Sequence, residues 1–216
     1  MIHAVAPLLL SFALFLQAPA QLSGAAHTEP IPPELAAPVA AQLAPGGVRA
    51  TASGTTLTFW WVKALPVNAG SAAPSWADVE EGSLVGAVRI DAPFRDIRGR
   101  VIKPGVYTLR YGIQPANGDH LGVSPFRDFL LISPSAVDTN AAPTGHDGTI
   151  DLSKKTVGGS HPAVWSIDPP AATEAPLTVH TTDLGHDALV VEIPVTRAGQ
   201  PGTLRFGIVL VGRIEA

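Results

Sequence analysis

The sequence predicts an all-β fold, a two-layer β-sandwich or jelly-roll-like domain of roughly seven to eight strands with little helix. Three observations lead to this. Glycine and proline contribute 21 residues each to a chain of 216, and such frequent turn formers favour many short strands. Several segments alternate apolar and polar residues with a period of two, as half-buried strands do. No long segment carries the 3.6-residue apolar period of an amphipathic helix.

The first 20 residues are predicted to be a signal peptide, so the protein is expected to be exported, either to the periplasm or outside the cell. The apolar run from Ala4 to Leu16 is shorter than the roughly 20 residues of a membrane-spanning helix. Small residues suit cleavage after Ala20 and also after Ala26. N-terminal sequencing of exported protein should therefore not begin at Met1.

Residues 21–46 are rich in alanine and proline and are predicted to be a linker. The prolines are Pro30, Pro32, Pro33, Pro38 and Pro45. Residues 47–216 are predicted to form a single β-sandwich domain, because no internal repeat or second linker divides them.

The strands of this domain are predicted where apolar residues alternate or run together between turn signals. They are residues 55–65, 83–90, 106–114, 129–133, 177–181, 188–195 and 203–211. Residues 152–157 are expected to form one helical turn, ended by two glycines.

The third of these strands shows the alternation most clearly. Four apolar side chains share one face, which should be buried, and they are Tyr107, Leu109, Tyr111 and Ile113. Thr108 and Arg110 point the other way, so the second face is predicted to be wet or to line a site.

Composition excludes several functional classes. The chain has no cysteine, which rules out disulfides, thiol catalysis and zinc–thiolate sites. Its net charge is −4, which argues against nucleic acid or anionic membrane as a partner. After removal of the signal no run approaches spanning length, so no membrane span is expected.

Polar residues gather in the loop between the third and fourth strands. Asp119, His120, Arg127 and Asp128 lie within ten residues there, with His161 as an expected neighbour. Loops held by rigid strands are frequent binding sites, so these five residues are the candidate ligand-binding set. The alternative is a structural loop, in which Asp119 accepts backbone N–H groups and Arg127 pairs with Asp119 or Asp128.

No sequence motif for catalysis is present. The chain lacks an H-E-x-x-H helix, a G-x-S-x-G elbow and a phosphate-binding loop. No catalytic residue is therefore assigned. A secreted carbohydrate-active enzyme stays as an alternative, with Asp119, His120 and Asp128 in acid–base roles and an exposed tryptophan of the pair Trp60–Trp61 stacking on a sugar.

Two resemblances are carried by residues 85–165. The stretch K-P-G-V-Y-T-L-R-Y, followed by G-D-H-L-G-V-S-P-F-R-D-F-L-L-I-S-P and S-H-P-A-V, resembles a family of secreted bacterial proteins of unknown function, which implies no activity. The P-G-x-Y turn, the Asp119-His120 turn and the following apolar strand are similar to the CopC-type copper-binding sandwich. That resemblance implies copper held by His27 as the first mature residue, together with Asp119 and His120. Here Asp119 and His120 are adjacent, whereas the copper-binding domains space this pair by one residue.

These observations favour an exported, non-catalytic binding or interaction module whose ligand, a protein or a carbohydrate, is unknown. No cofactor is expected of such a module. A periplasmic copper-binding protein and a secreted carbohydrate-active enzyme are the two alternatives.

Overall fold

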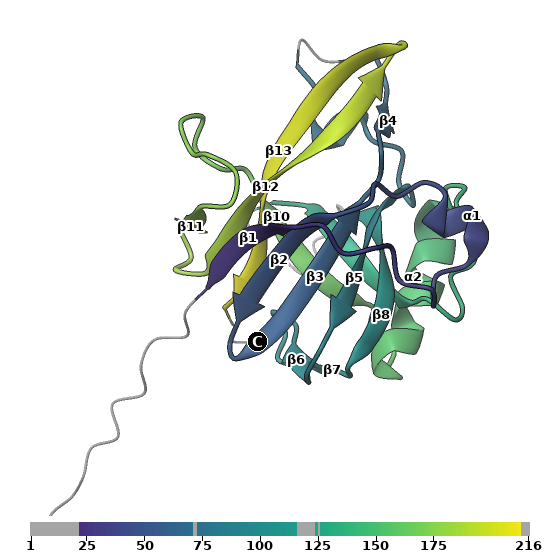
Figure 1. The fold of residues 1–216 in the computed structure, drawn as a ribbon, viewed down its shortest axis with the longest axis vertical. Coiled ribbons are helices and arrows are strands. Elements are labelled where there is room, and N and C mark those ends of the chain that lie inside the picture. Colours follow the sequence, from purple (N-terminus) through teal and green to yellow (C-terminus); the bar gives the residue numbers. More distant parts are fainter. Residues whose placement is uncertain (1–21, 71–72, 116–123, 125, 213–216) are drawn as a thin grey trace, which may run out of the picture.

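The computed structural model describes residues 22–70, 73–115, 124 and 126–212, and the predicted signal peptide lies outside them. The chain is mostly β, with 46% strand and 11% helix. Ten strands follow one another by hydrogen bonding in one curled sheet, in the order β1-β2-β3-β5-β8-β9-β10-β13-β12-β11, and β4 joins that sheet by pairing with β12 (Figure 1). A second, small sheet consists of β6 and β7.

The strands have the following bounds. They are β1 (Ser23–His27), β2 (Gly47–Ala52), β3 (Thr55–Trp61), β4 (Leu65–Val67), β5 (Leu84–Ile90), β6 (Phe94–Arg95), β7 (Val101–Ile102), β8 (Gly105–Ile113), β9 (Asp128–Pro134), β10 (Ala163–Asp168), β11 (Val179–Thr181), β12 (Asp187–Arg197) and β13 (Gln200–Val211). The helices are α1 (Ala37–Ala40) and α2 (Gly145–Val157), with a 3-10 turn at Trp76–Asp78.

The all-β class predicted from the sequence is confirmed, but the strands form one curled sheet with a small second sheet. Strand β10 joins its two halves, because it pairs with β9 along one edge and with β13 through Ile167 and Asp168 on the other. The two ends of the sheet come together. A Cβ atom added to Gly24 of β1 would lie 2.5 Å from the side chain of Leu189 on β12. Six strands of the described residues were not predicted from the sequence. Three of them, β4, β6 and β7, have two or three residues, and the others are β1, β2 and β10, of which β2 does alternate buried and exposed residues.

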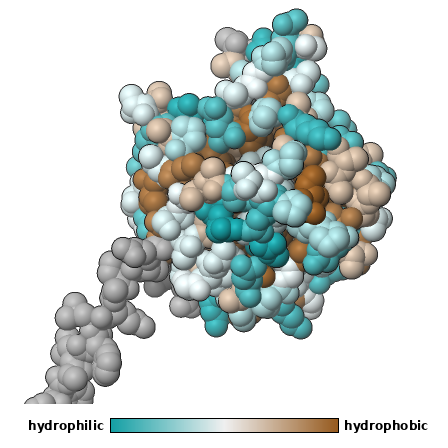
Figure 2. Space-filling view, in the orientation of Figure 1, coloured by the Kyte–Doolittle hydropathy of each residue, from teal (hydrophilic) through white to brown (hydrophobic). Residues whose placement is uncertain are grey.

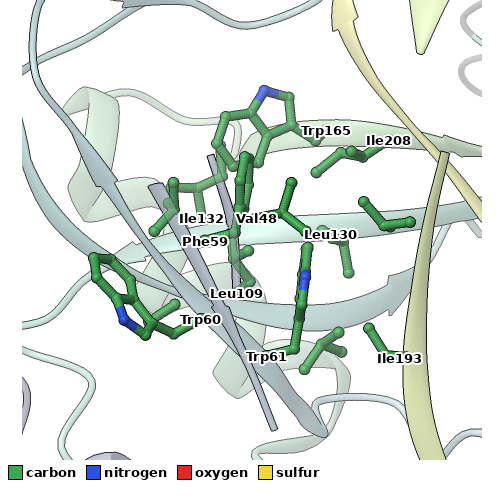
Figure 3. Packing of buried hydrophobic residues seen from close by; sticks show 14 of the residues in the cluster. Val48, Phe59, Trp60, Trp61, Leu109, Leu130, Ile132, Trp165, Ile193 and Ile208 are labelled. Carbon is green, nitrogen blue, oxygen red and sulfur yellow. The ribbon is translucent and has the colours of Figure 1, made fainter. Parts of the chain in front are cut away.

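The core fills the inside of this curl. Phe59 of β3 stacks on Trp61 with ring centroids 5.3 Å apart, and it meets Trp165 of β10 at 5.6 Å (Figure 3). Trp61 also packs edge-on against Phe206 of β13. Aromatic contacts thus hold strands from opposite sides of the sheet together. Trp60 and Trp61 are both buried, so neither offers the exposed stacking surface considered for a sugar.

The predicted linker is part of the fold over residues 22–46, which is a correction to the sequence analysis. Strand β1 pairs with β2 along its whole length. Leu35, Val39 and Leu43 are buried in the core. Val39 lies within the short helix α1, and Leu35 and Leu43 lie on either side of it.

The face of β8 that carries Thr108 and Arg110 was predicted to be wet or to line a site, and it is not wet at these two residues, because both are buried. Arg110 is 0% exposed and Asp138, its ion-pair partner, is 2% exposed. The reason is that α2 and the segment before it cover this face. The opposite face is buried as predicted at Tyr107, Leu109 and Tyr111. Among the described residues, no helix has both the length and the apolar character needed to span a membrane.

Candidate functional site

A groove of about 260 Å³ lies on the face of β8, β9 and β10 that points away from the core. Its floor is apolar and consists of Phe129, Leu131 and Val164, from β9 and β10. Gly112 leaves room for the side chain of Leu131, because a Cβ atom there would lie 2.1 Å from Leu131 Cδ1. Helix α2 forms one wall. Small-molecule sites typically combine such an apolar, concave floor with a few placed polar groups.

Helix α2 presents a stripe of three residues to the groove. His146, Ile150 and Lys154 follow one another at intervals of four, so they lie on one side of the helix. Eight residues of helix span roughly 12 Å. The stripe therefore has polar ends and an apolar centre.

Polar side chains, rather than apolar ones, fasten α2 to the sheet. Ser153 Oγ lies 2.9 Å from the carbonyl oxygens of Ile132 and Ala163 and accepts the N–H of Ala163 at 3.0 Å. Thr156 Oγ1 donates to the Ile132 carbonyl at 2.6 Å. The helix ends at Gly158, whose left-handed backbone (φ 67°) closes the last turn. These bonds hold the wall at a fixed distance from the floor.

One end of the groove contains an acid–histidine pair, Glu81 and His146. His146 Nδ1 lies 2.7 Å from Glu81 Oε1. The same oxygen accepts the backbone N–H of Ile113 at 3.0 Å. Both side chains are partly exposed. The carboxylate of Glu81 is thus already engaged by two partners from the protein.

Asp96 organises the opposite end of the groove. Its carboxylate is buried and accepts the backbone N–H groups of Arg98 and Arg100 at 3.1 and 2.9 Å. The guanidinium of Arg100 binds the same carboxylate and donates to the carbonyl oxygens of His161 and Pro162. The turn that carries Arg98 is therefore held beside the loop that carries His161.

Lys154 of α2 reaches this same end, because the neighbouring Ser153 is bonded to Ala163. Its Nζ lies 3.3 Å from Asp151 Oδ1, but the Asp151 side chain is 72% exposed, so this pair is weak. We call Arg98 and Lys154 the cationic end of the groove, and His161 lines the same groove. Among the described residues that line the groove, Glu81 is the sole carboxylate.

Of the five residues predicted to bind a ligand, the structure places His161 in the groove. Asp119 and His120 lie outside the described residues. Arg127 is exposed, and its Nε donates to the carbonyl of Gln114 at 2.8 Å.

Asp128 does not line the groove and binds Tyr111 instead. It accepts the hydroxyl of the buried Tyr111 at 2.6 Å, on the opposite face of β9 from Phe129. Burial raises the pKa of Tyr111 above its ordinary value, and the hydrogen bond to Asp128 adds to this rise. Tyr111 is therefore a neutral hydrogen-bond donor to the carboxylate of Asp128.

His27, the residue considered for copper, lies in β1 with both ring nitrogens engaged. Nδ1 accepts the backbone N–H of Glu29 at 3.1 Å, which leaves the proton on Nε2 to be donated to the Phe59 carbonyl at 2.9 Å. Its ring also packs edge-on against Trp60. A metal bound at this imidazole would have to displace one of these bonds. Among the described residues, no three His, Cys, Asp or Glu side chains are placed to hold a metal ion.

The residues of the groove that the sequence analysis missed are Glu81, Arg98, His146 and Lys154. The spacing of His146, Ile150 and Lys154 was a usable signal. Two features weaken this signal: Gly145 and Gly148 disfavour helix, and the buried residues of α2, Thr149 and Ser153, are polar.

A second polar cluster lies away from the groove, around His180 of β11. His180 Nδ1 lies 2.8 Å from Glu174 Oε1 and its Nε2 lies 2.9 Å from Asp168 Oδ2. The hydrogen bond with Glu174 raises the pKa of His180, and that with Asp168 adds to the rise against the effect of burial. Burial raises the pKa of Asp168, while His180 opposes this. With both nitrogens occupied, His180 fastens the segment before β11 to the end of β10.

Comparison of the chain with protein-family models, with curated proteins and with solved structures found no match.

Proposed function

We propose that this protein is an exported, non-catalytic binding module whose ligand site is the groove between α2 and strands β8–β10. The observation that carries the proposal is the groove itself, with its apolar floor, its fixed wall and polar residues at its two ends. Export is supported by the composition of residues 1–20. On the face in Figure 2, apolar areas are separated by hydrophilic residues rather than joined in one broad patch.

A binding role is favoured over catalysis by the partners of the polar groups. Glu81 and His146 bind each other, and Glu81 also accepts the backbone N–H of Ile113 in β8. The polar groups at the groove are arranged to orient a ligand rather than to attack it.

The proposal is tested with a neutral apolar fluorophore, N-phenyl-1-naphthylamine, whose emission rises in an apolar environment. We expect saturable binding to the full protein. Ile150→Glu should lower the affinity about tenfold or more, because it places a carboxylate at the apolar centre of the groove.

The matched control is Leu152→Glu, which makes the same change on the same helix at a partly buried residue that does not line the groove. Circular dichroism should show that both variants are folded. Equal binding by the two variants, or no binding by the wild type, would contradict the proposal.

A further inference from the structure

We infer that the ligand of the groove is an amphipathic carboxylate, a linear apolar chain whose carboxylate is held by Arg98 and Lys154. This inference rests on the proposed function and names the class of ligand that the groove would take. It is carried by the unequal charge of the two ends, which are separated by an apolar middle.

The apolar middle determines the body of the ligand. Phe129, Leu131 and Val164 form the floor, and Ile150 faces the groove from the wall. These side chains offer a ligand no hydrogen bonds, so a sugar or another polyhydroxylated compound would lose its hydration without compensation. An alkyl chain gains about 0.8 kcal/mol for each methylene that it buries.

The cationic end determines the position of the charge. Arg98 and Lys154 reach it from different elements, a turn held by Asp96 and the helix α2. Within the described part of the chain, the guanidinium of Arg98 forms no hydrogen bond or ion pair, and Lys154 has the weak pair with the exposed Asp151. Their charges are therefore available to an anion. Because both lie beside an apolar surface, that interaction is screened less than it would be in open water.

The opposite end determines the orientation. Glu81 would repel a second carboxylate, so the anionic group of a ligand should avoid it. The roughly 12 Å between His146 and Lys154 suits a medium-length chain lying along α2.

The experiment compares decanoate with decanol, which has the same chain but no charge. Both are titrated into the full protein below their aggregation concentrations, by displacement of N-phenyl-1-naphthylamine and by calorimetry. We expect decanoate to bind about tenfold more tightly than decanol at low salt. The advantage should shrink as salt is added, because salt screens a partly exposed charge pair.

Substitutions test whether Arg98 and Lys154 bind the carboxylate of the ligand. Lys154→Met and Arg98→Met should each lower the affinity for decanoate about fivefold to tenfold and leave that for decanol unchanged. Lys155→Met is the matched control, because Lys155 is the next residue of the same helix and does not line the groove.

The outcomes separate this inference from the proposed function. Equal affinity for decanoate and decanol would overturn the inference while the groove stays a site for apolar ligands. Binding of the fluorophore without binding of either chain would also overturn it. An equal loss of decanoate affinity in Lys154→Met and Lys155→Met would overturn it as well. If neither the fluorophore nor either chain binds, the proposed function itself fails.

Discussion

Arg110 shows how one side chain positions the wall of the groove. Its Nε and Nη2 donate to the two carboxylate oxygens of Asp138 at 2.7 and 2.8 Å. Its remaining donors reach the carbonyl oxygens of Gly82, Asn140 and Ala142. The guanidinium thus ties the segment before α2 to β8 and to the residues just before β5. The alternation along β8 predicts the strand and its buried face, but Arg110 lies on the other face, and alternation alone cannot show which distant segment covers it.

Arg110→Ala should therefore lower the free energy of unfolding by about 3–5 kcal/mol, because it leaves the buried carboxylate of Asp138 without its cationic partner, with the neutral hydroxyl of Thr108 still bonded to it. The loss should be comparable with that of Leu109→Ala, for which we expect about 2–5 kcal/mol from the lost burial and the cavity. Urea denaturation followed by tryptophan fluorescence measures both. If the urea midpoint of Arg110→Ala equals that of the wild type, Arg110 does not hold residues 138–142 in place.

His180 gives the stability a pH dependence of defined sign. Its folded pKa is raised above 6.5 by Glu174 and then Asp168. The stabilisation is therefore complete below that value and is lost as the pH rises through the folded pKa. The pKa of Asp168 is raised by burial. This carboxyl group therefore also makes the stability fall as the pH rises, but in a more acidic range than His180 does.

We expect the wild type to lose more unfolding free energy between about pH 6 and pH 9 than His180→Asn does. Urea midpoints of both proteins across this range provide the measurement. Parallel pH profiles for the two proteins would show that His180 has no raised pKa in the folded state.

Elements with long alternating patterns were predictable, whereas elements held by polar contacts were not. The segments predicted at 83–90 and 106–114 correspond to β5 and β8. Helix α2 was expected to be one turn and spans 13 residues. Its sheet-facing side chains include the buried Thr149 and Ser153, so the apolar stripe that usually marks a packed helix is missing. Strands of two or three residues, such as β6 and β4, are too short to show any period.

Ser153→Ala should lower the free energy of unfolding by about 1–3 kcal/mol, because the buried N–H of Ala163 loses its acceptor. It should also loosen the wall of the groove. Ser160→Ala is the control, since Ser160 is exposed, and its unfolding curve should match the wild type. A similar small effect for both substitutions would show that packing, rather than these hydrogen bonds, holds α2 in place.

At the scale of the whole molecule, the closure of the sheet could not be predicted from the sequence. Strand β13 lies between β10 and β12, and β1 meets β12 across the curl through Gly24 and Leu189. These pairings join segments far apart in the chain, and periodicity gives no information on which strands become neighbours. The groove also could not be predicted from the sequence, because its lining comes from segments far apart in the chain: β8, β9, β10, α2 and the turn at Arg98.

Because β1 is part of the sheet, cleavage at the two predicted sites should give products of different stability. Cleavage after Ala20 keeps the whole of β1, and with it the partly buried Leu22, which packs against the core. Cleavage after Ala26 removes every residue of β1 except His27 and so exposes the edge of β2. It also uncovers Leu189, which is buried against Gly24, and burying a leucine side chain is worth about 1.5–3 kcal/mol.

We therefore expect a chain that begins at Gln21 to have a free energy of unfolding about 1–3 kcal/mol higher than one that begins at His27. Intact-mass analysis of exported protein should give the mass that starts at Gln21. The copper alternative needs the other outcome, because only cleavage after Ala26 makes His27 the first residue and supplies its free amine. Equal unfolding midpoints for the two chains would show that β1 adds nothing to the closed sheet, and stability would then no longer favour cleavage after Ala20.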